Sequence, residues 1–422
     1  MGNSLQAVKG MHDLLPGDLD KWQYVESSIR SLMQLYGYSE IRTPLVENTG
    51  LFSRAIGEVT DIVEKEMYTF QDRNGDSLSL RPEGTASSVR AGIEHGLFHN
   101  QQQRLWYMGP MFRHERPQKG RYRQFNQVGV ETFGFAGPDI DLELILITAR
   151  LWKILGITGL KLELNSLGTA ECRSTYKRVL VDYFEKNRSM LDEDSLRRLE
   201  RNPLRILDSK SPEMRSLISD APLLTDYIND ESRTHFEFLV QGLGRHGVEY
   251  EINPRLVRGL DYYSRTVFEW VTDELGAQSA VCAGGRYDAL VGLLGGKDTP
   301  AVGFAIGLER IIELIRCQAI PVPGAAPDVY MVFADAVAET HGFTIAEQMR
   351  NERFNVVMHC GGGSLKSQMK KADRSGARFA LLLGEEEISR NAVTLKDMSG
   401  DTDQSSISID ELSGYLRKHI SE

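Results

Sequence analysis

The sequence predicts an α/β (α+β) fold: an antiparallel sheet flanked by helices, a helical insertion, and a C-terminal α/β domain. The segment 170–245 is charged, helical in pattern and poor in strand signals. After PVPGAAP at 321–327, a linker by composition, a strand–helix–strand rhythm indicates a separate domain. Before that linker, strand-like stretches recur at 77–83, 104–112, 124–135, 265–272 and 301–308.

The segment 139–156, DIDLELILITARLWKILG, has apolar residues at helical spacing, begins with an acid and ends at a glycine, so it predicts a buried helix. LKLELN follows and alternates leucines with polar residues, which is the pattern of a half-buried strand. The stretches 104–112 and 124–135 flank a basic loop. Two antiparallel strands joined by that loop are the simplest arrangement. The predicted domains are 1–169 together with 246–322, the insertion 170–245, and the C-terminal 328–422.

The composition is that of a globular chain with room for two or three domains, since 41% of its 422 residues are hydrophobic. No apolar run approaches the roughly 20 residues of a membrane helix, and the first residues lack the apolar stretch of a secretory signal. The four cysteines lie far apart, without Cys-x-x-Cys spacing. This pattern predicts a reducing, cytoplasmic location and no structural zinc.

The loop at 113–125, RHERPQKGRYRQF, carries five Lys and Arg side chains around the single acid Glu115, although the formal net charge of the chain is −10. Non-specific binding to nucleic acid scales with the number of phosphates neutralised, so an acidic chain is not expected to coat nucleic acid. A negative surface that concentrates cations in one loop is expected to bind phosphates there.

Two short stretches around this loop suggest a site, but each alone has a second interpretation. GYSEIRTPL at 37–45 places Pro44 before apolar residues, which also suits an edge strand. FRHE at 112–115 sets Arg113 and Glu115 two apart on a presumed strand, so both point to the same face. The arginine suits a phosphate and the acid could hold it or magnesium, but a surface salt bridge has the same spacing.

GFAIGLER at 303–310 is the third stretch, in which a small-residue strand runs into Glu309 and Arg310. Glycines there would let a flat base lie against the backbone while Arg310 reaches an anionic tail; a packing joint between strand and helix is the other interpretation. GLGRHG at 242–247 matches a dinucleotide motif in spacing only. A helix precedes it and a strand follows, which favours glycines that end a helix.

In this order and combination, the three stretches resemble motifs 1, 2 and 3 of the class II aminoacyl-tRNA synthetases. LVRGLDYY at 256–263 and AGGRYD at 283–288 resemble the two histidine-specific motifs of histidyl-tRNA synthetases, and RPEGT at 81–85 also fits that family. The resemblance covers essentially the whole chain. It implies a class II catalytic domain interrupted by the insertion, followed by a C-terminal anticodon-binding domain.

The resemblance implies ATP-dependent attachment of L-histidine to its cognate tRNA through a histidyl-adenylate, carried out by a cytoplasmic homodimer. The chain shows neither a nucleophilic serine elbow nor a cysteine–histidine signature. The substrate carboxylate is already ionised and is itself the nucleophile, so positioning and charge stabilisation can carry the first step.

For histidine, a carboxylate and a phenol can read the donor and the acceptor on opposite edges of an imidazole. By resemblance, Glu131 and Tyr263 take these roles, Glu83, Thr85 and Gln127 hold the α-amino group, and Tyr262 and Tyr287 wall the ring. Core packing is the other interpretation of the tyrosines. The full histidine-binding set implied by the resemblance is Glu83, Gly84, Thr85, Gln127, Glu131, Arg258, Tyr262, Tyr263 and Tyr287.

For ATP, the resemblance makes Arg113 and Arg258 the catalytic residues, gripping the α-phosphate from opposite sides. Arg310 would hold the far end of ATP. Magnesium is expected only as the counter-ion of ATP, without a dedicated protein site. The ATP-binding set is Arg113, Glu115, Arg121, Phe125 and Arg310.

For tRNA, the tip of the basic loop is expected to reach the acceptor end, and a basic stretch at 364–378 lies where the resemblance places the anticodon domain. A solvated helix face is the other interpretation of that charge run. The implied tRNA-binding residues are Arg116, Lys119, Arg123, Lys366, Lys370 and Arg374.

Two other classes of protein remain open from the sequence. A synthetase-like regulatory subunit of histidine biosynthesis would bind histidine without making the adenylate, and it is expected to lack the C-terminal domain and some ATP arginines. A tRNA-binding adaptor would not need both an ATP site and a histidine site. Histidine-dependent exchange of pyrophosphate into ATP separates the three classes.

Overall fold

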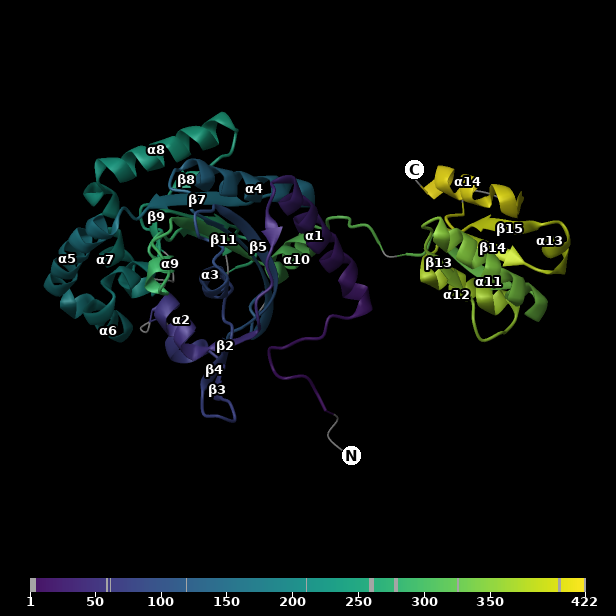
Figure 1. The fold of residues 1–422 in the computed structure, drawn as a ribbon, viewed down its shortest axis with the longest axis horizontal. Coiled ribbons are helices and arrows are strands. Elements are labelled where there is room, and N and C mark those ends of the chain that lie inside the picture. The colour runs from purple at the N-terminus through teal and green to yellow at the C-terminus, as the bar shows by residue number, and fades with distance from the viewer. Residues whose placement is uncertain are drawn as a thin grey trace. The chain divides into compact units, whose positions relative to one another are not determined.

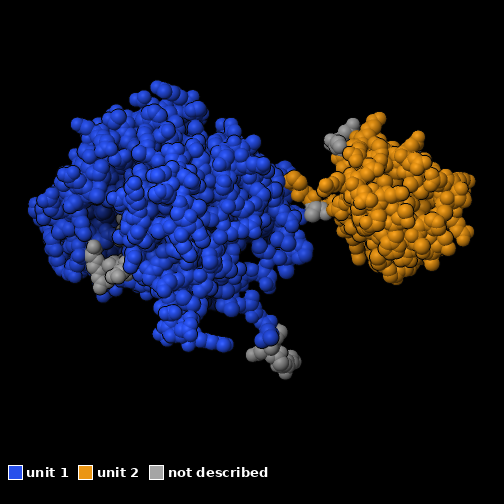
Figure 2. Space-filling model, viewed as in Figure 1, with its two compact units in different colours: residues 1–322 blue, residues 323–422 orange. Residues whose placement is uncertain are grey.

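The computed structural model describes residues 5–57, 60, 62–118, 120–209, 211–257, 262–276, 280–324, 326–400 and 404–420. The chain forms two compact units, residues 1–322 and 323–422 (Figure 2). The boundary falls inside the predicted linker 321–327. The segment 170–245 lies within unit 1, so its limits as a separate domain stay a prediction.

Unit 1 is built around an eight-stranded sheet with the order β1-β5-β6-β11-β10-β9-β7-β8. From β5 to β7 every strand is antiparallel to its neighbour, whereas β1 is parallel to β5 and β8 to β7. The predicted antiparallel sheet is confirmed. In chain order the strands are β1 (Ser39–Glu40), β5 (Gln103–Phe112), β6 (Gln124–Phe133), β7 (Lys161–Ser166), β8 (Glu251–Ile252), β9 (Ser264–Val271), β10 (Ala280–Arg286) and β11 (Ala301–Gly307).

The pair β5 and β6 is the predicted long hairpin around the basic loop. Its register runs from Gln103 opposite Phe133 to Phe112 opposite Gln124 without a shift. Side chains alternate along a strand, so Val128 and Val130 of β6 point to one face, and Gln127 and Glu131 to the other. The apolar face joins the main core, which leaves the polar face for a site.

Four helices cover the apolar face of the sheet, and Figure 1 shows α8 and α4 lying along it. The central one, α4, is the helix predicted from the sequence: acids occupy its first turn, and Gly156 ends it with a left-handed φ of 70°. Buried leucines, isoleucines and tryptophans from these helices and the sheet form one core. The helices are α1 (Pro16–Leu35), α4 (Asp139–Leu155), α8 (Asp230–Arg245) and α10 (Leu308–Cys317).

The opposite face of the large sheet carries smaller elements. A three-stranded sheet of order β2-β4-β3 holds the predicted strand-like stretch 77–83, whose strand ends at Leu80. Three helices pack together beside it. These elements are β2 (Val46–Asn48), α2 (Thr49–Ile56), β3 (Thr69–Gln71), β4 (Ser77–Leu80), α3 (Thr85–Glu94) and α9 (Leu290–Leu293).

The predicted insertion is helical, as its composition indicates. Asp192 and Thr169 cap two of its helices by accepting backbone N–H groups. Its buried residues, such as Tyr176 and Leu180, share a core with the smaller elements on the opposite face of the large sheet. Besides α8 and four short 3₁₀ turns, its helices are α5 (Ala170–Lys186), α6 (Glu193–Arg201) and α7 (Arg215–Ser219).

Unit 2 is a separate α/β layer, as predicted. Its sheet has the order β13-β12-β14-β15-β16, with β12 parallel to both neighbours and the last strands antiparallel. Helices α11 and α14 pack on one face, and the basic helix α12 on the other. The elements are β12 (Val329–Phe333), α11 (Ala336–Asn351), β13 (Val356–Met358), α12 (Leu365–Ser375), β14 (Phe379–Leu383), α13 (Glu385–Ser389), β15 (Ala392–Asp397), β16 (Ser405–Ser408) and α14 (Ile409–Ile420).

The structure departs from the sequence-based expectations in a few places. The motif AGGRYD lies at the end of β10, a strand that its glycines obscure. The presumed strand under FRHE ends at Phe112, so Arg113 and Glu115 lie just beyond it. In GLGRHG, Gly242 and Gly244 lie inside α8, as expected for a helix end rather than a cofactor loop. Across the described residues, no helix is long and apolar enough to cross a membrane.

Candidate active site

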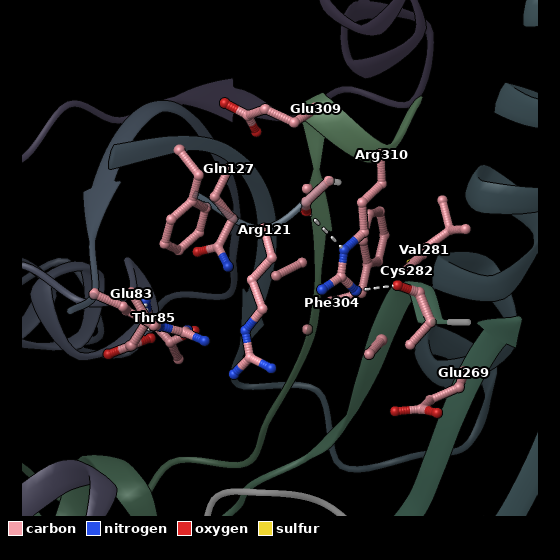
Figure 3. Close-up of a pocket in the computed structure, with 18 of the residues that line it drawn as sticks. Glu83, Thr85, Arg121, Gln127, Glu269, Val281, Cys282, Phe304, Glu309 and Arg310 are labelled. Atoms are coloured by element: carbon pink, nitrogen blue, oxygen red, sulfur yellow. Dashed lines mark hydrogen bonds between the residues drawn. The ribbon is translucent and has the colours of Figure 1, made fainter. Parts of the chain in front are cut away.

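A cavity of about 210 Å³ lies on the polar face of the large sheet. In Figure 3, Glu83, Thr85 and Gln127 lie on one side, Arg310 and Glu269 on the other, and Arg121 between them. Its walls come from the start of α3, the β5–β6 hairpin with its basic loop, residues 262–263, β10, and the β11–α10 junction. The predicted residues that line it are Glu83, Thr85, Arg113, Glu115, Arg121, Phe125, Gln127, Glu131, Tyr262, Tyr263, Tyr287 and Arg310.

At one end of the cavity, the buried Glu131 carboxylate accepts hydrogen bonds from three hydroxyl groups. Thr85 Oγ1 donates to Oε1 at 2.7 Å and Tyr107 donates to the same oxygen at 3.3 Å, while Tyr287 donates to Oε2. Burial raises the pKa of Glu131 to about 8, and Glu83 adds to this, although the hydroxyls oppose it. A carboxylate has about four lone-pair sites, so these donors leave about one for a ligand.

Two glycines make this arrangement possible. A Cβ at Gly303 of β11 would lie 2.0 Å from Glu131 Oε2, so only glycine lets the carboxylate lie against that strand. Gly84, whose predicted contact with histidine stays a prediction, lies against a ring: a Cβ there would be 2.2 Å from the Tyr107 ring. Gly84 therefore supports the pocket through Tyr107.

Glu83 and Gln127 supply further oxygen atoms. The carboxylate of Glu83 caps the start of α3 by accepting the N–H groups of Thr85 at 2.6 Å and Ala86 at 2.9 Å. Burial raises the pKa of Glu83 despite these bonds. Oε1 of Gln127 is buried and accepts no hydrogen bond from the described residues, so it can serve a ligand's N–H group.

The three predicted tyrosines form a cluster in the cavity wall. The ring centroids of Tyr262 and Tyr263 are 4.7 Å apart, and those of Tyr262 and Tyr287 are 5.5 Å apart. Their rings also belong to a hydrophobic core, so they both pack in the interior and border the cavity. Burial raises the pKa of Tyr287 well above its usual value, so its hydroxyl keeps the proton that it donates to Glu131.

Arginines line the cavity from Glu83, beside Arg113, to the far end, where Arg310 lies. Arg113 donates from Nε to the carbonyl of Pro82 at 2.8 Å, and its guanidinium lies 5.3 Å from the Phe125 ring centroid. The predicted pair with Glu115 exists only as a long contact of 3.9 Å, because Glu115 pairs mainly with Arg121. Partial burial lowers the pKa of Arg113.

The motif 3 residues close this end. Arg310 donates from Nε to the carbonyl of Gly120 at 3.4 Å and from Nη1 to that of Ala280, so it ties the basic loop to β10. Glu309 accepts the backbone N–H of Asn126 at 2.7 Å, and burial raises its pKa to about 7.

Apart from Gly84, seven predicted residues lie elsewhere or are not described. Arg258 and Lys119 fall outside the described residues. Arg116 is exposed, while Arg123 donates to the backbone carbonyl of Glu115 at 3.2 Å. The remaining ones lie on the exposed side of α12 in unit 2, namely Lys366, Lys370 and Arg374.

Three further residues were not predicted from the sequence: Tyr107, Tyr122 and Glu269. The last two line the cavity, and Tyr107 contacts Glu131. Tyr107 stands opposite Gly129 in the β5–β6 register. Gly129 lies two residues before Glu131 on β6, so both point to the same face. A hairpin register deduced from the sequence would have placed Tyr107 beside Glu131.

The three motif segments around one antiparallel sheet define the catalytic fold of a class II aminoacyl-tRNA synthetase. A family model described as "Histidyl-tRNA synthetase" matches residues 10–311, and one described as "Anticodon binding domain" matches residues 329–419. The chain therefore belongs to the histidyl-tRNA synthetase family. It is a histidine–tRNA ligase that uses ATP to attach L-histidine to tRNA, through the histidyl-adenylate that is standard for the family.

Solved structures agree with this assignment. The chain is similar to apo histidyl-tRNA synthetase from S. aureus, with 34% identity, a TM-score of 0.83, and coverage of 98% of this chain and 100% of that one. The enzyme from Nostoc sp. PCC 7120 shares the fold at 20% identity, with a TM-score of 0.73 and coverage of 99% and 100%.

A Bacillus halodurans protein titled "ATP phosphoribosyltransferase regulatory subunit/histidyl-tRNA synthetase" also shares the fold at 20% identity, with a TM-score of 0.64 and coverage of 88% and 97%. This likeness concerns the fold alone. The regulatory-subunit interpretation predicted a chain without the C-terminal domain, whereas residues 329–419 match one.

Proposed function

We propose that the cavity binds histidine at its Glu131 end and ATP between Arg113 and Arg310, and that it joins them directly. One observation supports this most: the described side chains predicted for histidine and for ATP come from distant segments and line the same cavity. A carboxylate that accepts hydroxyl groups lies at one end, and guanidinium groups extend from beside Glu83 to Arg310 at the far end. Arg258, predicted to bridge the two substrates, keeps that role as part of the proposal.

For histidine, the hydroxyls of Thr85, Tyr107 and Tyr287 leave Glu131 one acceptor site, which suits one imidazole nitrogen. Tyr263, at the edge of the tyrosine cluster, takes the other nitrogen. Glu83 and the unpaired Oε1 of Gln127 receive the α-ammonium group. A site with buried polar groups that lose their partners rejects analogues by roughly 10⁴-fold or more, which would make editing unnecessary.

For the reaction, a carboxylate oxygen of histidine attacks the α-phosphorus of ATP. A bond forms between them, the bond from that phosphorus to the oxygen bridging the β-phosphate breaks, and pyrophosphate leaves with the electron pair. Arg113 and Arg258 offset the negative charge that grows on the α-phosphate. A hydroxyl at the 3′ end of tRNA then attacks the activated carbonyl carbon and gives up its proton. The bond from that carbon to the α-phosphate oxygen breaks, and AMP leaves with the electron pair.

Magnesium enters this scheme as part of the ATP substrate. Within the part of the chain that the structure describes, no group of three His, Cys, Asp or Glu side chains could hold a metal ion. Glu115, Glu269 and Glu309 do line the cavity. We therefore assign Mg²⁺ to the phosphates of ATP, with these acids facing its hydration shell.

The partners follow from the same assignment. The exposed Arg116, together with Lys119 and Arg123 of the loop, would face the acceptor end of tRNA, and the exposed cations of α12 would face its anticodon stem. Motif 1 leads into Leu45 and Val46, which are 42% and 38% exposed, and this apolar edge supports a homodimer through motif 1. The site of action is the cytoplasm, where tRNA is charged.

Histidine-dependent exchange of labelled pyrophosphate into ATP tests the proposal. The wild-type protein should exchange pyrophosphate only when histidine, ATP and Mg²⁺ are all present. Exchange without histidine, or with another amino acid in its place, would refute the assigned pocket. Light scattering of the dilute protein tests the dimer, and a monomer mass would refute that part alone.

A further inference from the structure

The N-terminal segment of the chain lies against the basic loop, and neither the resemblance nor the mechanism above uses it. Residues Val8 to Met11 form a tight turn, closed by the N–H of Met11 donating to the carbonyl of Val8 at 2.9 Å. Gly10 takes a left-handed φ of 84° in this turn and is buried, although its neighbours on both sides are partly or fully exposed.

The turn is joined to the loop through the backbone. The carbonyl of Gly10 accepts the N–H of Arg123 at 2.8 Å and that of Gln124 at 3.3 Å. The guanidinium of Arg123 reaches back to the carbonyls of Glu115, at 3.2 Å, and Lys9, at 3.4 Å. Arg123 therefore connects both ends of the loop to the N-terminal turn.

Side-chain packing strengthens the same contact. The ring of His12 meets the ring of Tyr122 edge to face, with 4.7 Å between centroids. A Cβ at Gly10 would lie 2.9 Å from Cγ of Arg123 and 2.9 Å from Cγ of Pro117, so the glycine is packed directly against the loop. On its other side, the loop presents Gly120, Arg121 and Tyr122 to the cavity.

We infer that residues Val8–His12 act as a brace that seats the basic loop over the ATP end of the cavity, which makes Gly10 and His12 positioning residues for ATP. This rests on the proposed place of ATP between Arg113 and Arg310. The brace touches the loop and not the Glu131 end, so its loss should weaken ATP binding and spare histidine binding. It also gives Arg123 a role in positioning the loop, beside the tRNA contact proposed above.

Gly10→Ala is the main test, with Gly75→Ala as the matched control. Gly75 has a similar φ of 89° but nothing within 4 Å of an added Cβ, so both variants strain the backbone and only one crowds the loop. Left-handed strain is large enough to change a local equilibrium by about 5- to 30-fold. In pyrophosphate exchange, we expect Gly10→Ala to raise the KM for ATP by about that factor and to leave the KM for histidine unchanged.

His12→Ala removes the ring contact without backbone strain and should raise the KM for ATP by about 2- to 10-fold. If Gly10→Ala does not fold, the KM of His12→Ala for ATP tests the brace. Equal ATP KM values for Gly10→Ala and Gly75→Ala would overturn the brace, and so would equal increases in the KM for both substrates. If the wild type shows no exchange, the proposed function fails, and the Kd for ATP from equilibrium dialysis of the same variants still tests the brace.

Discussion

The buried carboxylate of Glu131 should make the empty catalytic unit less stable as the pH rises, and Glu131→Gln should remove that dependence. Burial raises the pKa of Glu131 from 4.5 to about 8. A carboxyl group whose pKa is higher in the folded state than in the unfolded state destabilises the fold once the pH exceeds the unfolded pKa, and the cost grows until the pH reaches the folded pKa. The window is therefore pH 4.5 to 8.

The magnitude follows from the linkage between protonation and unfolding. Each pKa unit corresponds to about 1.4 kcal/mol, so ionising Glu131 costs about 1 kcal/mol at pH 5 and about 4 kcal/mol at pH 8. A glutamine has the same shape and does not titrate. Its own effect on packing is independent of pH and cancels between the two conditions. Glu131→Gln should therefore gain about 3 kcal/mol relative to wild type between pH 5 and pH 8.

Urea unfolding followed by tryptophan fluorescence is the suitable assay. The four tryptophans all lie in unit 1, so the signal reports the catalytic unit even if unit 2 unfolds separately. The exposed Glu249→Gln controls for the loss of a surface carboxylate. If the stability difference between Glu131→Gln and wild type is the same at both pH values, burial does not hold the carboxyl as described.

Three other predictions follow. Tyr287→Phe leaves a buried oxygen of Glu131 without its hydroxyl partner, which costs about 1–3 kcal/mol, so the KM for histidine should rise about 5- to 100-fold while the KM for ATP stays the same. An unchanged KM for histidine would count against the pocket. Arg286→Met leaves Asp141 buried without its guanidinium partner and should lower the free energy of unfolding by about 3–5 kcal/mol in the fluorescence assay. An unchanged free energy of unfolding would contradict the pairing. Alanine at each of the three exposed cations of α12, Lys366, Lys370 and Arg374, should weaken tRNA binding and leave pyrophosphate exchange unaffected. The slope of log affinity against log salt concentration should fall by about 2–3, and an unchanged slope would indicate a solvated helix face that does not contact tRNA.

The Arg286 prediction depends on a network that the sequence does not reveal. Arg286 and Asp141 are both fully buried and paired, and Asp141 also accepts His235 Nε2 at 3.1 Å. Burial alone would raise the pKa of Asp141, but hydrogen bonds and charge from His235 and Arg286 hold it below its usual value. Because Arg286 precedes Tyr287 on the chain, this network also fixes the end of β10 beside the pocket.

Much of the fold could be predicted because its signals are local. Helix α4 was readable from apolar spacing, acids and a final glycine, and the β5–β6 hairpin from alternating residues around a loop. The strand β10 was not, because Gly284 and Gly285 weaken its pattern. Glycine is required at 284, where a Cβ would lie 2.4 Å from the carbonyl oxygen of Gly303, and this constraint comes from a neighbouring strand.

The candidate site divides in the same way. The types and order of the motif residues indicated which side chains would meet. Of the predicted residues that the structure describes, all line the cavity except Gly84 and those predicted to contact tRNA. Their partners were not readable. FRHE suggested a pair between Arg113 and Glu115, whereas Glu115 pairs mainly with Arg121, because the loop folds back beyond the end of β5.

By itself, the sequence determined which chemical groups are available and in what order, since residue type and local spacing are written along the chain. Only the tertiary structure decided which groups share an atom and how far each lies from water. Three hydroxyls from α3, β5 and the end of β10 converge on Glu131, and their closeness to it depends on Gly303 in β11 and on Gly84 before α3. A pKa of about 8 and a brace on the loop are results of such distant contacts, because desolvation and packing are set by whatever the fold brings near.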